Sequence, residues 1–159
     1  MPTSKITEDD ALFRIAVEID DRASERLDEL AGEELDDARR QLVDDSMTTV
    51  LESVVRLNPV ETGRARSAWV RALREAGGEA PAGWRGSRSR SGAVAEGASL
   101  GGLSRSAGRS RDEVSATNSV SYIRYLEYGT SKMQAFAMVR RSIAQAVPRL
   151  REVFSFPPE

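Results

Sequence analysis

The sequence predicts an α+β domain, with a long N-terminal helix and a C-terminal helix packed on a small antiparallel sheet. Residues 21–57 contain no proline and one glycine, and they are rich in Leu, Glu, Asp, Arg and Ala, which is typical of a long helix. Residues 12–19 alternate along the chain as a half-buried strand does. Apolar residues recur at helical spacing between 136 and 154, which indicates a second long helix.

The composition bounds the class of protein. A chain of 159 residues with 40% hydrophobic and 30% charged residues suits one domain with a modest core, which we place at 12–155. Cysteine and histidine are both absent, so disulfides, thiolate nucleophiles, the usual zinc sites and histidine-based catalysis are excluded. No apolar run approaches membrane-spanning length and no signal-peptide pattern opens the chain. We therefore expect a soluble protein without a membrane partner, assembled in the cytoplasm.

The net charge of −2 conceals an asymmetry. Residues 1–58 hold 16 acidic and 7 basic side chains, residues 59–111 hold 4 and 10, and residues 112–159 hold 5 and 6. Two interpretations fit this split. Opposite-sign patches could join copies of the protein or its partners. Alternatively, an acidic helix is simply solvated beside an unstructured basic loop.

The chain begins with an expected flexible lead-in at 1–11, followed by the strand. In that strand Phe13, Ile15, Val17 and Ile19 share one side, although helical spacing also fits and periodicity alone does not decide. The long helix carries two opposed apolar faces, one built before and one after Asp44-Asp45-Ser46. Either the helix breaks near Ser46, or its halves pack against different neighbours, as in a ring subunit.

A reversal of the chain is expected after the long helix. Pro59 ends the helix because it pushes the preceding residue out of the helical region. Thr62 and Gly63 then make a turn in which the threonine hydroxyl can bond nearby backbone N–H groups. From Arg64 to Arg74 we prefer a strand, with Trp69 on one face, although a helix fits as well.

Residues 78–111 have an unusual composition. Their 34 residues include 8 Gly, 7 Ser and 6 Arg, which buries too little to offset the entropy of ordering. We expect a long insertion loop. It is either a mobile surface segment or an arm that orders on assembly. Such an arm would contact a neighbouring ring or, non-specifically, packaged DNA through its arginines, which are Arg85, Arg88, Arg90, Arg105, Arg109 and Arg111.

After a return strand at 113–118, a short helix capped by Asn118 or Ser119 is predicted to carry three tyrosines. Gly129 would end this helix, and a polar turn containing Thr130 and Lys132 would lead to Met133. The rings either pack in the core or form a subunit-facing patch. Glu127 is a candidate partner for Arg64 or Arg66. The tyrosines are Tyr122, Tyr125 and Tyr128.

The C-terminal helix is predicted to be kinked at Pro148, which interrupts the helix but not the phase of its apolar stripe. The stripe consists of Phe136, Val139, Ile143, Val147, Leu150 and Phe154. Residues 156–159 form a tail that could dock on a partner.

No enzymatic chemistry is expected. Neighbouring carboxylates such as Asp36-Asp37 point about 100° apart on a helix, so they do not form a shared acid–base site. EF-hand spacing, a Walker loop and a Gly-x-Ser-x-Gly elbow are all missing from the sequence. We expect no catalytic residue, cofactor, metal or small-molecule substrate.

Two segments together resemble one family. Pro-Val-Glu-Thr-Gly-Arg at 59–64 and Tyr-Leu-Glu-Tyr-Gly-Thr-Ser-Lys-Met at 125–133 are similar to motifs of the HK97 gp10-like family of tailed-phage proteins. The resemblance spans residues 12–155, is poor between 77 and 111, and departs from the family at Ala65, where leucine is usual. It implies an N-terminal strand and a structural role for both motifs.

The resemblance implies a structural virion protein of the head–tail junction, a neck or tail-completion protein, from a tailed phage or a gene transfer agent. Such a protein acts by assembly: copies form a ring between a head-side connector and the tail terminator or tail tube. A tail terminator ring that caps the tube is the alternative within the family. A non-specific nucleic-acid-binding module that uses the Arg/Ser-rich arm is the alternative of another class.

Overall fold

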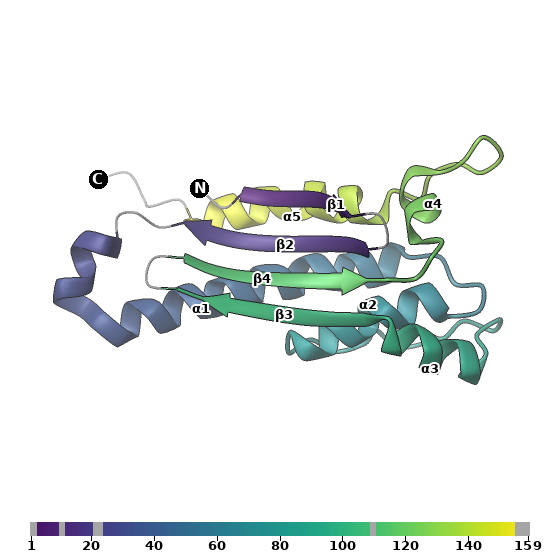
Figure 1. Ribbon diagram of the computed structural model, residues 1–159, viewed down its shortest axis with the longest axis horizontal. Coiled ribbons are helices and arrows are strands. Elements are labelled where there is room, and N and C mark those ends of the chain that lie inside the picture. The colour runs from purple at the N-terminus through teal and green to yellow at the C-terminus, as the bar shows by residue number, and fades with distance from the viewer. Residues whose placement is uncertain (1–2, 10–11, 21–23, 109–110, 155–159) are drawn as a thin grey trace.

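The computed structural model describes residues 3–9, 12–20, 24–108 and 111–154. Helices and one four-stranded antiparallel sheet confirm the α+β class, and the strand order is β1-β2-β4-β3 (Figure 1). The elements are β1 (Thr3–Asp9), β2 (Leu12–Asp20), α1 (Ser24–Leu57), α2 (Arg64–Glu75), α3 (Ser91–Ser99), β3 (Gly101–Ala107), β4 (Arg111–Asn118), α4 (Ile123–Tyr128) and α5 (Met138–Phe154).

The sheet has one covered and one open face. β2 and β4 form its centre, with Ile15 paired to Ala116 and Val17 to Val114, and all four side chains are buried. Arg14 points the other way and donates to Glu113 at 2.7 Å on the open face. This alternation is what an antiparallel sheet with one solvated face requires. The predicted strands at 12–19 and 113–118 are thus confirmed.

The N-terminal edge of the sheet differs from the prediction. Thr3–Asp9 forms β1 and pairs antiparallel with β2, so most of the expected flexible lead-in at 1–11 belongs to the sheet. Residues 1–2 and 10–11 lie outside the described residues. An isolated seven-residue segment gave no clear strand pattern, and its partner strand supplies the hydrogen bonds that order it.

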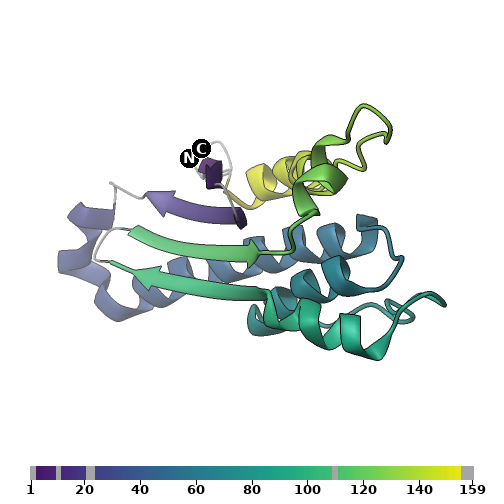
Figure 2. The ribbon, with the colours of Figure 1, turned by 45° about the vertical axis from the view of Figure 1, so that its right-hand side comes forward.

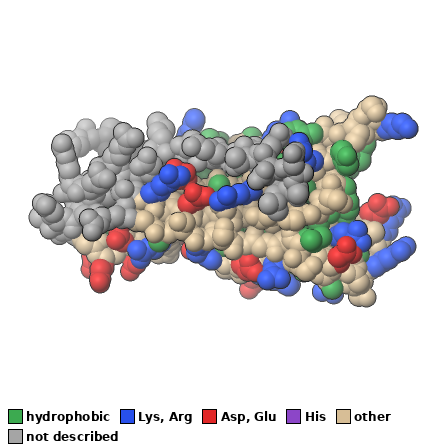
Figure 3. Space-filling view, in the orientation of Figure 1, with side chains coloured by type: hydrophobic (Ala, Val, Ile, Leu, Met, Phe, Trp, Pro, Cys, Tyr) green, Lys and Arg blue, Asp and Glu red, His purple; other side chains and the backbone are tan. Residues whose placement is uncertain are grey.

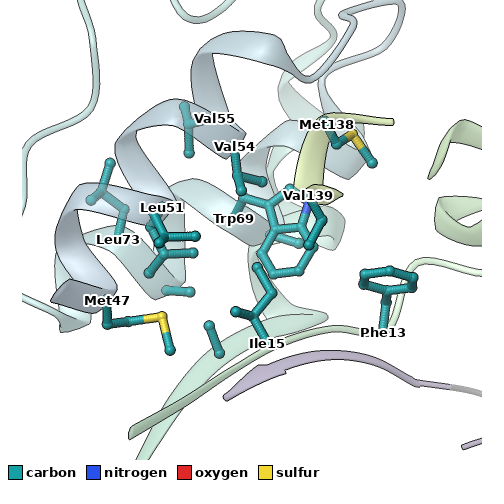
Figure 4. Close-up of a cluster of buried hydrophobic side chains, with 14 of the residues drawn as sticks. Phe13, Ile15, Met47, Leu51, Val54, Val55, Trp69, Leu73, Met138 and Val139 are labelled. Carbon is teal, nitrogen blue, oxygen red and sulfur yellow. The ribbon is translucent and has the colours of Figure 1, made fainter. Parts of the chain in front are cut away.

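The core lies between the covered face of the sheet and the helices α1, α2 and α5. Figure 4 shows Trp69 of α2 at its centre, with Ile15 and Phe13 from β2 below it and Met138 and Val139 from α5 beside it. The Phe13 ring meets the Trp69 ring edge-on, with ring centroids 6.5 Å apart. The C-terminal half of α1 completes the core with Val43, Met47, Val50, Leu51, Val54 and Val55.

The bend in α1 lies at Gly32, where the backbone leaves helical geometry (φ 42°, ψ −124°). At Ser46, where a break was one of two alternatives, the helix continues and the hydroxyl donates to the Leu42 carbonyl at 2.6 Å. Glycine can adopt a positive φ without a steric penalty, whereas a switch of apolar face needs no break at all.

A buried ion pair fastens α1 to β4. Arg39 Nε donates to Asp112 Oδ2 at 2.6 Å, and both side chains are only 4% exposed. Arg39 Nη2 also donates to the Gly108 carbonyl at 3.1 Å. Burial alone would lower the pKa of Arg39, but the hydrogen bond and the charge of Asp112 raise it above the usual value. The guanidinium therefore stays charged at this join.

The segment after the Thr62-Gly63 turn is a helix, so the preference for a strand was wrong. α2 buries six apolar side chains, and five of them follow the spacing of three and four residues that marks a helical face. The strand interpretation used the alternation around Trp69, which spans too few residues to distinguish the two periods. The five are Ala65, Ala68, Trp69, Ala72 and Leu73.

Residues 78–111 are not one long loop. They contain α3 and β3, and among their described residues only 78–90, Leu100 and Gly108 lack helix or strand. Glycines bring this segment onto α2: a Cβ at Gly97 would lie 1.9 Å from the Arg64 carbonyl oxygen, and one at Gly101 would lie 2.0 Å from that of Ala68. The glycine content of this segment indicated a loop, but two of its glycines are positions where the backbones pack closely.

Candidate docking surface

The Thr62-Gly63 corner joins the end of α1 to α2 and α3. Gly63 has φ 87°, and a Cβ there would lie 2.9 Å from atoms of both Ser89 and Val94. The Thr62 carbonyl accepts from the Arg90 N–H at 3.0 Å, whereas its hydroxyl is 3.5 Å from the Arg64 nitrogen. The predicted reversal is present, but backbone contacts fix it more than the threonine hydroxyl does.

The arginines after this corner are fixed by local partners. Arg64 pairs with Glu96 of α3 at 2.6 Å. Arg66 donates through Nε to the Asn58 carbonyl at 2.8 Å and through Nη1 to the Trp84 carbonyl at 3.0 Å. Burial lowers the pKa of Arg66. Pro59 lies beside these contacts, because its own carbonyl accepts from the Asn58 amide at 2.8 Å.

Glu127 is fully buried and binds the start of α5, so its predicted pairing with Arg64 or Arg66 was wrong. Its carboxylate accepts from the backbone N–H of Val139 at 2.9 Å and of Arg140 at 3.1 Å. Arg140 Nε donates to the same carboxylate at 3.0 Å. A carboxylate at a helix N-terminus satisfies unpaired N–H groups and the helix dipole together.

Gly129 ends α4, as predicted. Its φ is 78°, and a Cβ there would lie 2.7 Å from the Met133 carbonyl oxygen. The loop then closes on itself, with Thr130 N–H donating to that carbonyl at 2.8 Å and Lys132 N–H to the Thr130 hydroxyl at 3.2 Å. Figure 2 shows this loop projecting beyond the start of α5.

The start of α4 lies later than predicted. Asn118 accepts from the Val120 N–H at 3.1 Å and donates to the Ala65 carbonyl at 3.0 Å, so it orders the turn that precedes the helix. The helix itself begins at Ile123, and neither Asn118 nor Ser119 is its N-cap.

Three large hydrophobic side chains are exposed around α4. Tyr125 is 58% exposed, Tyr128 42% and Phe136 39%, and no other large hydrophobic side chain of the described residues is exposed to this degree. We call Tyr125, Tyr128 and Phe136 the aromatic end. Tyr128 also contacts the Phe13 ring and lies under the Arg140 guanidinium at 5.0 Å. Tyr122 instead packs against the core, so Tyr122 has the core role, while Tyr125 and Tyr128 are exposed.

The arginines predicted to form an arm have diverse surroundings. Arg105 donates to Asp44 at 2.9 Å, and Arg111 pairs with Glu18. Arg85 lies 5.2 Å over the Trp84 ring. Arg88 and Arg90 are exposed. Arg109 lies outside the described residues.

A groove of about 530 Å³ lies between α2 and α3, and the chain at 84–85 borders it. Its floor includes Val70 and Val94, which are buried. Arg71, Arg74 and Arg85 also line it. This groove was not predicted from the sequence, because its formation requires both α3 and a helical α2.

Neither a metal-binding cluster nor a membrane-spanning helix is found in the described residues. Within them, no group of three or more acidic side chains is placed to hold a metal ion. No described helix has the length and apolar character to cross a bilayer. Comparisons of the chain with protein-family models, with curated proteins and with solved structures found no match.

Proposed function

We propose that this protein is a structural virion component of the head–tail junction, a neck or tail-completion protein of a tailed phage or of a phage-derived particle such as a gene transfer agent. It acts by assembly and not by catalysis. Copies form a ring that docks between the head-side connector and the tail terminator or tail tube.

The observation that carries this proposal is the aromatic end. Three exposed rings gather on α4 and the following loop, and this region is held in place by the buried Glu127 carboxylate and by Gly129. A cluster of exposed aromatic side chains on a rigid support is characteristic of a protein–protein docking site. The two segments that resemble the phage family therefore support a surface, and neither assembles a set of reactive groups.

The alternatives differ in what they would bind. A tail terminator ring would bind the tail tube without the head connector. A non-specific nucleic-acid module is less well supported, because Arg105 and Arg111 of the predicted arm already pair with carboxylates of the same chain. Contact with packaged DNA would then involve the exposed Arg88 and Arg90.

The test is native mass measurement of the purified protein, alone and mixed with head connector or with tail tube. We expect stable complexes with particle components. A Tyr125→Ser/Phe136→Ser double variant should keep the wild-type melting temperature and lose that binding. The matched control is Ser131→Ala/Gln134→Ala in the same loop, which should bind normally. A protein that remains monomeric and binds no particle component would refute the proposal.

A further inference from the structure

We propose that the α2–α3 groove, lined by residues of α2, of α3 and of the chain at 84–85, receives the acidic first part of α1, residues 24–38, from a second copy. This inference rests on the self-assembly in the proposed function and identifies the two surfaces that meet. It concerns a part of the molecule other than the aromatic end.

The groove combines an apolar floor with a rim of three arginines and one carboxylate, that of Glu75, which pairs with Arg71. Val70 and Val94 lie at its base, and Ala98 is half-buried beside them. Arg74 is exposed and forms no ion pair with any described residue, while Arg85 is held over the Trp84 ring. Two cations thus border an apolar channel and lack carboxylate partners within the described chain. Such a groove fits an amphipathic helix with acidic side chains.

The first part of α1 has the complementary composition. Residues 24–38 contain seven acidic side chains and one basic side chain, a net charge of −6. Glu33 and Glu34 are exposed and form no ion pair with any described residue. Leu35 is half-buried and Ala38 is exposed, and the two lie three residues apart on one helical face. This part of α1 therefore offers an apolar strip between acidic side chains.

The two surfaces lie at opposite ends of the molecule. Figures 1 and 2 show α1 projecting beyond the sheet at one end, while α3 lies near the other. Figure 3 shows several acidic side chains beside the grey atoms at the end with the projecting helix, and both basic and acidic side chains at the far end. One copy cannot fill its own groove in this way, so the contact is heterologous and repeats head to tail.

A competing occupant is a nucleic-acid backbone, since arginines also bind phosphates. The floor of the groove argues against it, because Val70 and Val94 would gain nothing from a charged backbone. Residues 24–38 would use both parts of the groove, because their acidic side chains match the arginines and their apolar side chains match the floor.

Cysteine cross-linking tests the contact directly, because the chain contains no cysteine of its own. Ala38→Cys protein and Ala95→Cys protein are mixed at equal concentration and oxidised. We expect a mixed disulfide dimer in clear excess over the two self-dimers. Ser131→Cys in place of Ala95→Cys is the control at an exposed loop. A mixed yield no higher than this control would overturn the proposal.

Charge reversal provides the second test. Arg74→Glu/Arg85→Glu and Glu33→Lys/Glu34→Lys should each weaken self-association by about tenfold or more, since like charges then face each other. Mixing the two variants should restore association. Arg56→Glu/Arg149→Glu, with the same charge change away from the groove, should have no effect. The interface would be contradicted if the mixture failed to associate. It would also be contradicted if the groove variant lost DNA binding but kept its self-association.

The results separate the interface from the proposed function. Cross-linking through the groove without binding to head or tail components would retain this interface and refute the junction role. Binding to those components without a mixed cross-link would retain the junction role and refute this interface.

Discussion

Glu127 shows how one side chain can join two elements. Its carboxylate has no solvent exposure and accepts hydrogen bonds from two backbone N–H groups at the start of α5 and from Arg140. Because α4 carries Tyr125 and Tyr128 of the aromatic end, the same carboxylate also sets the position of these exposed rings relative to the core.

Glu127→Ala should therefore destabilise the protein by about 3 kcal/mol, because it leaves buried N–H groups without an acceptor and removes a helix cap. Urea unfolding followed by circular dichroism measures the change. Arg140→Ala is the control, since its side chain is 47% exposed and should cost less than about 1 kcal/mol. Equal losses in the two variants would show that the capping hydrogen bonds contribute little.

At the level of single residues, the sequence was informative where the cause is local. Gly129 ends its helix as predicted, because a positive φ directly after an apolar helix favours glycine. The partner of Glu127 was not predictable, because it depends on where the chain returns after the loop at 129–136. Arg140 and Arg64 are equally plausible partners until that path is known.

Among the elements, α2 could have been assigned from its own sequence. Its buried residues repeat at intervals of three and four, and this pattern outlasts the short alternation that suggested a strand. α3 and β3 were hidden for a different reason. Composition cannot distinguish a glycine that loosens the chain from one that allows a helix to approach, and Gly97 and Gly101 are of the second kind.

Gly97→Ala should separate α3 from α2 and cost about 2–3 kcal/mol, as overpacking at a rigid backbone contact does. Gly92→Ala in the same helix is the matched control. A Cβ at Gly92 meets nothing within 4 Å, so the change should be neutral or stabilise by about 0.5–1 kcal/mol. Thermal unfolding compares the two. If both variants melt alike, the close approach of the helices is not rigid.

Glu75 connects α2 to the edge strand β3, and this contact depends on pH. Its carboxylate accepts from Arg71 Nε and from the Leu103 N–H, each at 2.8 Å. Burial by itself raises the pKa of Glu75, but these hydrogen bonds and the nearby arginines lower it below the usual value. The folded state therefore holds this proton less tightly than the unfolded state.

The stabilisation from Glu75 should be complete above about pH 4.3, the usual pKa of the side chain, and disappear as the pH falls through the lower folded-state value. Glu75→Gln should remove this part of the pH dependence. The side chain is 36% exposed, so solvent screening limits the effect to a few tenths of a kcal/mol. Unfolding midpoints between pH 7 and pH 3 measure it, and parallel curves for the two proteins would contradict the assignment.

On the scale of the whole molecule, the two proposed docking surfaces differ in character. The aromatic end offers apolar rings, whereas the α2–α3 groove and residues 24–38 offer opposite charges. Charges near the surface are screened by salt, because the Debye length falls from about 10 Å at 0.1 M to about 3 Å at 1 M.

Raising the salt concentration from 0.1 M to 1 M should therefore weaken self-association by about tenfold and leave docking through the aromatic end nearly unchanged. Sedimentation velocity measures the first, and retention on immobilised tail tube measures the second. If salt weakened only the second, the two surfaces would have been assigned to the wrong roles.

The bend at Gly32 has a consequence for subunit number. A repeated contact between unlike surfaces closes into a ring only when the turn from one subunit to the next divides a full circle, and otherwise it grows as an open spiral. Gly32 sets the direction in which the first turns of α1 leave the body of the protein. Its backbone angles would then set the rotation between neighbouring copies. One residue without a side chain would thus determine how many copies complete the circle.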